Sequence, residues 1–229
     1  MNHQLHPDFR VDKRSIGREK EPLLVIDNLL ANAEQLVDIA AAKVFAPVET
    51  YFPGIRAKVP LTYQQFIVRN LGGLFSEFFG LPLAQVRFSN CHFSLVTTPA
   101  DRLSYLQRIP HVDSYFGSQL AFVHYLFKSP LGGTAFYRQK STGFEYVDQS
   151  RQLEYTRRLE EERTGPHAPA PAYINGDTAL YEKLDGVEGV FNRLLVYRRN
   201  SLHSGSIAAD FVPDRNPRSG RLSVNGFLN

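Results

Sequence analysis

The chain has 229 residues, of which 43% are hydrophobic and 21% charged, a composition that is typical of a globular protein and excludes a disordered one. Its formal net charge of +3 is small and scattered, so we expect no tight binding of nucleic acid. No apolar run approaches the roughly 18 residues that span a membrane, and residues 1–18 lack an apolar signal-peptide core, so we expect a cytoplasmic protein without membrane contact.

The beginning of the chain predicts a strand followed by a helix. Residues 1–20 are polar and mixed in charge, and we expect them to form a loose arm. An apolar run at residues 23–26 ends in Asp27-Asn28 and predicts the first strand. Residues 33–43 carry apolar side chains at helical spacing, which predicts a helix.

A loop and a second helix are expected next. Residues 51–60 contain Pro53-Gly54 and Pro60, and these residues predict a loop. Thr62 and Gln65 have the spacing of a capping box and open a predicted helix that Gly80 ends.

Beyond residue 85 the pattern changes to short strands. Gly132-Gly133 predicts a tight turn in which at least one glycine has a positive φ. Residues 149–163 predict a charged helix, and the prolines of residues 164–172 predict a stiff loop. Cys91, the single cysteine, excludes a disulfide within the chain and reads as a small hydrophobic residue. The predicted strands are residues 86–96, 120–127, 134–137, 194–197 and 222–228.

This order of elements predicts one domain of the α+β class that is mainly β. Residues 1–85 would form the arm, the first strand and support helices, and residues 86–229 would form a closed or sandwiched antiparallel core.

His111 and Asp113 are the first candidate functional residues. In an extended segment, residues i and i+2 point to the same side, so this pair can present an imidazole and a carboxylate to one ion. His203, late in the chain, would complete a set of two histidines and one carboxylate, which leaves about three coordination positions open and suits iron(II). The dipeptide spacing alone is also compatible with an ordinary surface loop.

The order of the short motifs narrows the choice. His111-Val112-Asp113 is followed by a strand ending near Tyr125-Leu126, a Gly132-Gly133-Thr134 turn, His203, and Ser219-Gly220-Arg221 before the last strand. The opening Val25-Ile26-Asp27-Asn28-Leu29-Leu30 fits the same scheme. This series resembles the 2-oxoglutarate and iron(II)-dependent oxygenases, especially their prolyl-hydroxylase-like branch, over nearly the whole chain.

The resemblance implies a double-stranded β-helix, or jelly-roll, core with N-terminal support helices. It implies that His111, Asp113 and His203 bind Fe(II), that 2-oxoglutarate and O2 are co-substrates, and that ascorbate is a candidate reductant. The distal carboxylate of 2-oxoglutarate needs a buried cation, for which arginine is well suited. Arg221 matches the basic position of the family, and Arg218 is the alternative because the spacing of the loop before the last strand is not fixed.

Three further positions near the expected pocket follow from the same resemblance. Some members of the superfamily hold the co-substrate with an Asn-x-Tyr pair, where this chain has Asn90 and His92. The second position therefore departs from the family, and a structural role for His92 is equally open. Tyr125 occupies the place of the strand-end tyrosine of the family, which packing alone also explains, and His124 reads as a core histidine.

The expected function is oxidative decarboxylation of 2-oxoglutarate coupled to hydroxylation of a small-molecule or peptide substrate that the sequence does not identify. Asp113 occupies the position that a halogenase of this class leaves free for halide. Two alternatives from other classes remain: a catalytically inert jelly-roll binding protein, and a zinc hydrolase that uses the same His-Asp-His set.

Overall fold

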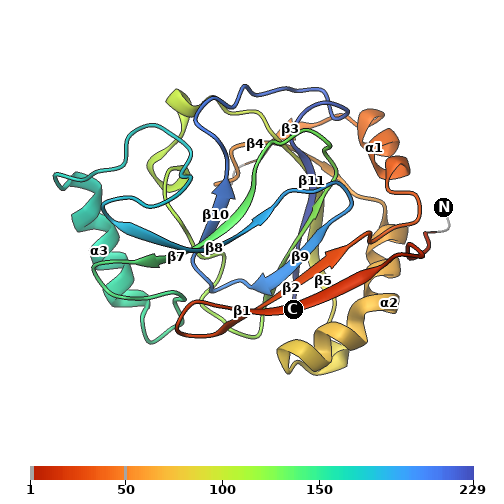
Figure 1. Ribbon diagram of the computed structural model, residues 1–229, viewed down its shortest axis with the longest axis horizontal. Coiled ribbons are helices and arrows are strands. Elements are labelled where there is room, and N and C mark those ends of the chain that lie inside the picture. Colours follow the sequence, from red (N-terminus) through yellow and green to blue (C-terminus); the bar gives the residue numbers. More distant parts are fainter. Residues whose placement is uncertain (1–2, 49–50) are drawn as a thin grey trace.

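A computed structural model describes residues 3–48 and 51–229 (Figure 1). The strands are β1 (Arg10–Ile16), β2 (Glu21–Asp27), β3 (Ala46–Pro47), β4 (Gly54–Lys58), β5 (Phe88–Val96), β6 (Leu120–Tyr125), β7 (Gly133–Gln139), β8 (Tyr181–Glu188), β9 (Leu194–Arg198), β10 (His203–Ser206) and β11 (Leu222–Leu228). The helices are α1 (Glu34–Ala41), α2 (Leu61–Phe79) and α3 (Gln152–Thr164). In the described part of the chain, no helix is both long and apolar enough to cross a membrane.

The strands of the described residues form two antiparallel sheets. The large sheet has the order β1-β2-β9-β6-β11-β5-β4-β3, and the small sheet has the order β10-β7-β8. In Figure 1, α1 and α2 lie on one side of the molecule and the small sheet and α3 lie on the other. Two facing sheets with helices on the outer face of the larger one form an open jelly roll rather than a closed barrel.

Alternation along the strands gives the large sheet two buried faces. On one face Phe93 packs with Phe75 of α2 in the larger hydrophobic core. On the other face Tyr197 packs against Phe136 of β7, with ring centroids 5.0 Å apart. Successive side chains of a strand point to opposite faces, so the helices cover one face and the small sheet covers the other. The gap between the two sheets holds the candidate site.

Several predicted elements are confirmed, including all three helices. Gly80 ends α2 in the left-handed region with φ 66°, as expected of a residue without a Cβ. The turn between β6 and β7 also forms as predicted, and Gly132 has φ 84°. The last strand, Leu222–Leu228, has the predicted bounds.

Three predictions about the N-terminal region are wrong. Part of the expected arm is β1, an edge strand in which only Ile16 is buried, so its sequence shows no alternation of apolar and polar residues. The expected loop at residues 51–60 contains β4, which pairs with β5. The predicted capping box is absent because Pro60 is the N-cap of α2 and no side chain caps this end.

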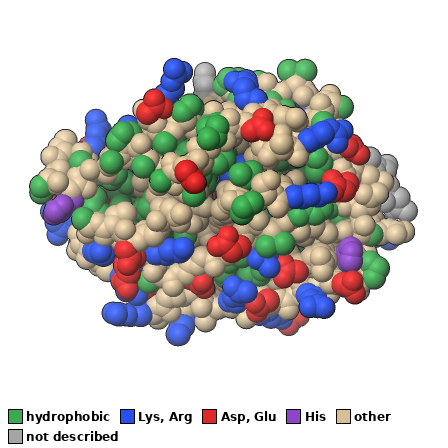
Figure 2. Space-filling model, turned by 45° about the horizontal axis from the view of Figure 1, so that its top comes forward, with side chains coloured by type: hydrophobic (Ala, Val, Ile, Leu, Met, Phe, Trp, Pro, Cys, Tyr) green, Lys and Arg blue, Asp and Glu red, His purple; other side chains and the backbone are tan. Residues whose placement is uncertain are grey.

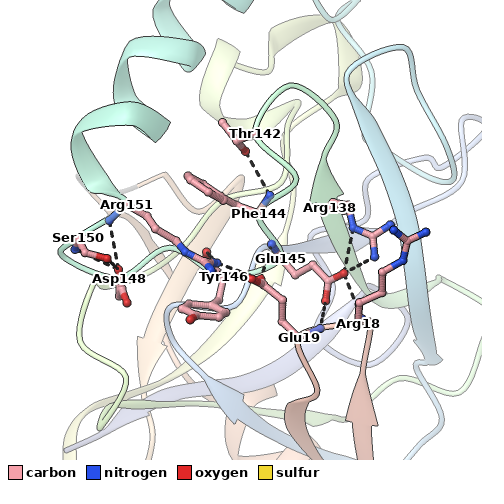
Figure 3. Close-up of polar contacts among 10 residues, drawn as sticks. All are labelled: Arg18, Glu19, Arg138, Thr142, Phe144, Glu145, Tyr146, Asp148, Ser150 and Arg151. Carbon is pink, nitrogen blue, oxygen red and sulfur yellow. Dashed lines mark hydrogen bonds and ion pairs between the residues drawn. The ribbon is translucent and has the colours of Figure 1, made fainter.

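Glu145 joins the β1–β2 hairpin to the segment that follows β7 (Figure 3). Its carboxylate accepts hydrogen bonds from the backbone N–H groups of Arg18 (3.1 Å) and Glu19 (2.9 Å) and from Nε of Arg138 (2.9 Å). Its own N–H donates to the side chain of Glu19 at 3.0 Å. The carboxylate is buried, and both of its oxygens accept hydrogen bonds. These bonds hold the hairpin that contains β1, the edge strand that the sequence pattern alone does not reveal.

Candidate metal centre

The segment that carries His111 pairs with β10. The N–H of His111 donates to the carbonyl of His203 at 2.9 Å, and the N–H of His203 donates to the carbonyl of His111 at 3.0 Å. His203 itself lies opposite Phe136 in the β10–β7 ladder. The His-x-Asp segment therefore extends the small sheet by one bridge, which brings the early and late parts of the core together.

The side chains of His111, Asp113 and His203 converge. Each offers a ligand atom, and the three atoms lie within 4.8 Å of one another. Nε2 of His111 is 3.8 Å from Oδ1 of Asp113, and Nε2 of His203 is 3.5 Å from Oδ2 of the same carboxylate. The His111 side chain is 40% exposed and that of His203 is 7% exposed, so the cluster is buried on one side and accessible on the other.

The hydrogen bonding of His203 prepares its imidazole for a cation. Nδ1 of His203 lies 2.9 Å from the carbonyl oxygen of Ser201, which can only accept, so Nδ1 carries the proton and Nε2 keeps its lone pair. Burial, with a smaller contribution from His111, lowers the pKa of His203 to about 4. The imidazole is therefore neutral at pH 7, the form in which histidine binds metals.

Arg199 holds the backbone of Asp113 in place. The N–H of Asp113 donates to the carbonyl of Arg199 at 2.8 Å, and Nη2 of Arg199 donates to the carbonyl of Asp113 at 2.9 Å. The guanidinium stacks over the ring of Phe227 at 3.9 Å and also donates to Gln119. This arginine is a positioning residue for the carboxylate, and the histidine spacing alone gave no indication of it.

The donor set fits a divalent transition metal. Two neutral imidazoles and one carboxylate on one side of an ion are the ligands of the facial triad of non-haem iron(II) proteins. Ligands at about 2.1 Å on adjacent octahedral positions are ~3 Å apart, so the separations here close onto one ion through small side-chain rotations. A structural zinc site would instead enclose the ion with four ligands, whereas this cluster leaves its exposed side open.

Arg221 lies on the same side of β10 as the cluster. Its side chain is buried, and Nε and Nη2 donate to the carbonyls of Leu131 (2.9 Å) and Gly133 (2.7 Å). A Cβ added to Gly205, two residues after His203 on β10, would lie 4.0 Å from Nη2 of Arg221. Residues i and i+2 of a strand share a face, so Gly205 leaves free the space between His203 and the guanidinium.

Arg218 is at the surface. It forms an ion pair with Asp38 at 2.7 Å, and both side chains are more than half exposed. Arg218 therefore lies outside the gap between the sheets. Of the two arginines that the sequence left open as the cation for a distal carboxylate, this position favours Arg221.

The other candidates line the gap to different degrees. Tyr125 is fully buried, and its hydroxyl lies 2.6 Å from Oγ1 of Thr134, with the Arg221 guanidinium 6.0 Å from the centre of its ring. His92 and Asn90 point to the same face of β5 as the gap, opposite to Cys91 and its core neighbours. Asn90 is exposed, and the structure gives it no contact with the histidine cluster.

His124 and Cys91 belong to the core. His124 is fully buried, with Nδ1 2.9 Å from the hydroxyl of Tyr63 and Nε2 3.2 Å from Oδ1 of Asn192. Burial lowers the pKa of His124 to about 4 and raises the pKa of Cys91 to about 12. The interpretation of His124 as a satisfied core histidine and of Cys91 as an inert hydrophobic residue is confirmed.

Fold and site together define a jelly-roll protein with a His-Asp-His cluster between its sheets. The chain belongs to the family described as "Family of unknown function (DUF6445)", whose model matches residues 7–228. No curated protein matches the sequence.

Solved structures share the fold at low identity. The non-haem α-ketoglutarate-dependent epimerase SnoN from nogalamycin biosynthesis matches with a TM-score of 0.52 at 12% identity, over 92% of this chain and 78% of that chain. SnoN with Fe3+, α-ketoglutarate and nogalamycin RO gives 0.50 at 11% identity, over 92% and 80% of the two chains. A prolyl-4-hydroxylase from Pseudomonas putida gives 0.43 at 14% identity, over 86% of each chain. The SnoN comparisons confirm the predicted jelly-roll class.

Proposed function

We propose that this protein is a non-haem iron(II) enzyme that couples oxidative decarboxylation of 2-oxoglutarate to hydroxylation, or a related oxidation, of a small molecule. The observation that carries the proposal is the placement of Arg221. The buried guanidinium of Arg221 lies beside Gly205, on the same face of β10 as His203 of the His111, Asp113 and His203 cluster.

The three side chains would hold the metal. His203 offers Nε2 because Nδ1 is committed to Ser201, and Arg199 holds Asp113 through two hydrogen bonds to its backbone. The hydrogen bond from Nδ1 of His203 to Ser201 orients this ligand and raises the basicity of its Nε2. When bound, an iron(II) ion with 2-oxoglutarate and O2 supplies the oxidant that cleaves a C–H bond of the substrate.

Arg221 would bind the distal carboxylate of the co-substrate. Burial lowers the pKa of Arg221, but a guanidinium stays protonated in proteins, so a full positive charge lies in the gap. Its Nε and Nη2 donate to main-chain carbonyls rather than to a carboxylate. A dianion that reaches from the metal to Arg221 would therefore neutralise a charge that is otherwise stabilised only by dipoles and aromatic faces.

The aromatic residues around His203 would keep water from the buried side of the centre. The ring of Tyr197 lies 4.8 Å from that of His203, and Phe136 packs edge-on against Tyr197. The structure of SnoN in complex with Fe3+ and α-ketoglutarate supports the same pair of groups for this fold. The motif order of the sequence supports a place near the prolyl-hydroxylase-like branch.

Succinate release tests the proposal. Protein supplied with iron(II), ascorbate, O2 and 2-oxoglutarate is expected to release succinate slowly without a primary substrate, and His203→Ala is expected to abolish this signal and weaken anaerobic iron(II) binding. Binding of 2-oxoglutarate without any succinate would instead identify an inert binding protein. A metal-loaded protein that binds no 2-oxoglutarate would rule out the oxygenase and leave the zinc hydrolase.

A further inference from the structure

The edge of the large sheet next to the metal centre carries cations that the proposed reaction does not use. On β4, Ile55 and Ala57 face the helical core, so Arg56 and Lys58 face the gap between the sheets. In the β4–β5 ladder Arg56 lies opposite Ser94, and Lys58 lies opposite His92. Two positive side chains, an imidazole and a hydroxyl therefore form one neighbouring group on this wall.

Arg56 faces the same gap as the metal centre. Its guanidinium stacks over the ring of Phe52 at 4.4 Å. Burial lowers the pKa of Arg56, and the negative charge of Asp113 opposes that shift. Arg56 forms no ion pair with any carboxylate in the described ranges, since Asp113 acts on it only at longer range.

Two polar atoms of this group are buried without a partner. Nε of Arg56 and Oγ of Ser94 accept or donate no hydrogen bond within residues 3–48 and 51–229. Ser94 is fully buried, and it lies directly across from Arg56 in the ladder. Buried donors are nearly always satisfied, so two adjacent unpartnered donors on the wall of a site indicate that a ligand supplies the acceptor.

The charges of the proposed centre do not neutralise this group. A divalent ion, the carboxylate of Asp113, a dianionic 2-oxoglutarate and Arg221 together sum to zero. Arg199 adds a further positive charge, although its hydrogen bonds go to the backbone of Asp113 and to Gln119. Arg56 and Lys58 thus have no counter-charge in the proposed centre, and an anion would be attracted to them.

We propose that Arg56, with Lys58 and the hydroxyl of Ser94, binds an anionic group of the primary substrate, a carboxylate or a phosphate. The inference rests on the proposed function, because a primary substrate exists only if the protein is an enzyme. It adds the chemical class of that substrate. Arg56 forms charge-assisted hydrogen bonds to the oxyanion, Ser94 donates one more, and Lys58 adds charge at the exposed rim. The rest of the substrate then extends from β4 towards the exposed side of His111.

Titration with simple anions tests the proposal. The protein is loaded with nickel(II) and saturated with 2-oxoglutarate, and inorganic phosphate or acetate is titrated in while the heat of binding is measured by calorimetry. At least one anion is expected to bind saturably, and the stronger of the two identifies the group as phosphate or carboxylate. Arg56→Gln is expected to weaken binding at least tenfold and Ser94→Ala roughly threefold.

Arg14→Gln is the matched control, because Arg14 is an exposed arginine of β1, the opposite edge of the same sheet, and pairs with Asp12. Equal anion affinity in wild type and Arg56→Gln, with both proteins folded by circular dichroism, would overturn the inference, as would displacement of the anion by 2-oxoglutarate. Binding of 2-oxoglutarate is measured separately in the same samples. A protein that fails to bind it but binds the anion through Arg56 refutes the proposed function and leaves the anion site standing.

Discussion

Arg221 is the single residue on which the co-substrate assignment most depends. It is 6% exposed, and burying a cation without a counter-charge costs several kcal/mol. The carbonyls of Leu131 and Gly133 offset part of that cost and also fix the direction of the guanidinium. A carboxylate that arrives beside it therefore meets an oriented partner.

Arg221→Gln is expected to weaken 2-oxoglutarate binding by about 2–4 kcal/mol, the cost of truncating one partner of a buried charge pair. Calorimetry on nickel-loaded protein measures this as a roughly 30- to 900-fold rise in Kd. Metal affinity should stay unchanged because the ligands are intact. Arg218→Gln is the control, and a loss of co-substrate binding in that variant alone would show that the surface arginine is the anchor.

His124 should make the stability of the fold depend on pH. Its folded-state pKa of about 4 lies below the ordinary 6.5, so the unfolded chain binds a proton first as the pH falls. The stability is full above pH 6.5 and is lost between pH 6.5 and 4, by about 3 kcal/mol in total. In urea unfolding, His124→Gln should flatten the slope in this window by up to about 1.4 kcal/mol per pH unit. An unchanged slope would mean that His124 is charged in the folded protein.

At the scale of elements, β10 would set the distance between a metal bound by His203 and the guanidinium of Arg221. Residues two apart on a strand are separated by about 6.6–6.8 Å, which is comparable to the length of a five-carbon diacid. His203 and Gly205 are such a pair, and the absence of a side chain at Gly205 leaves that length open. The glycine of the Ser-Gly-Ser sequence after His203 thus leaves room for a molecule of this length.

Gly205→Leu is expected to weaken 2-oxoglutarate binding at least tenfold, because its branched side chain would fill the space beside Arg221. Gly205→Ala is the matched control, since its Cβ would meet Ile207 at 3.6 Å and Arg221 at 4.0 Å, which are ordinary contact distances. Both variants should keep wild-type iron(II) affinity in an anaerobic titration. Tight 2-oxoglutarate binding by the leucine variant would place the co-substrate elsewhere.

The elements that the sequence predicts are those with a strong apolar pattern. Leu222–Leu228 and α2 bury one regular face each and were predicted accordingly. β1 is solvent-exposed along nearly its whole length, so it has no pattern to read, and it is held by pairing and by Glu145. β4 does alternate, as Ile55-Arg56-Ala57-Lys58, but its flanking Gly54 and Pro60 favoured a loop.

The residues of the candidate site likewise fall into those that the sequence predicted and those that it could not predict. Spacing and order along the chain predicted His111, Asp113, His203 and Arg221, and the structure gathers all four in one gap. Arg56 could not be predicted, because its place on the wall of the gap depends on the pairing of β4 with β5, which is a long-range contact.

On the scale of the whole molecule, the formal net charge is small. Figure 2 shows Lys and Arg side chains interspersed with Asp and Glu over the face in view, without a broad region of one sign. With a formal net charge of +3, this distribution supports the expectation of no tight nucleic-acid binding, which stays a prediction.

Glu145 connects distant parts of the molecule, and Glu145→Gln should therefore destabilise the whole fold. The amide would turn an NH2 group toward backbone donors and leave Arg138 with less charge compensation, at a cost of about 2–4 kcal/mol in the free energy of unfolding. Burial raises the pKa of Glu145, but its hydrogen bonds with Glu19, Arg138 and Arg18 together outweigh burial and lower the pKa in the folded state. The contribution of Glu145 is therefore present above the unfolded pKa and lost in acid. Equal denaturation midpoints for wild type and variant at pH 7 would contradict this role.

The bridge between His111 and His203 joins parts of the chain that are far apart in sequence. A metal bound there would act as a reversible cross-link that closes a long loop, as a disulfide does in proteins with more cysteines. The folded state would then gain RT ln(1 + [M]/Kd) in stability from the metal concentration [M]. Resistance of this protein to heat and proteases would consequently report on the supply of metal around it, and a chelator would shorten its lifetime as well as halt its turnover.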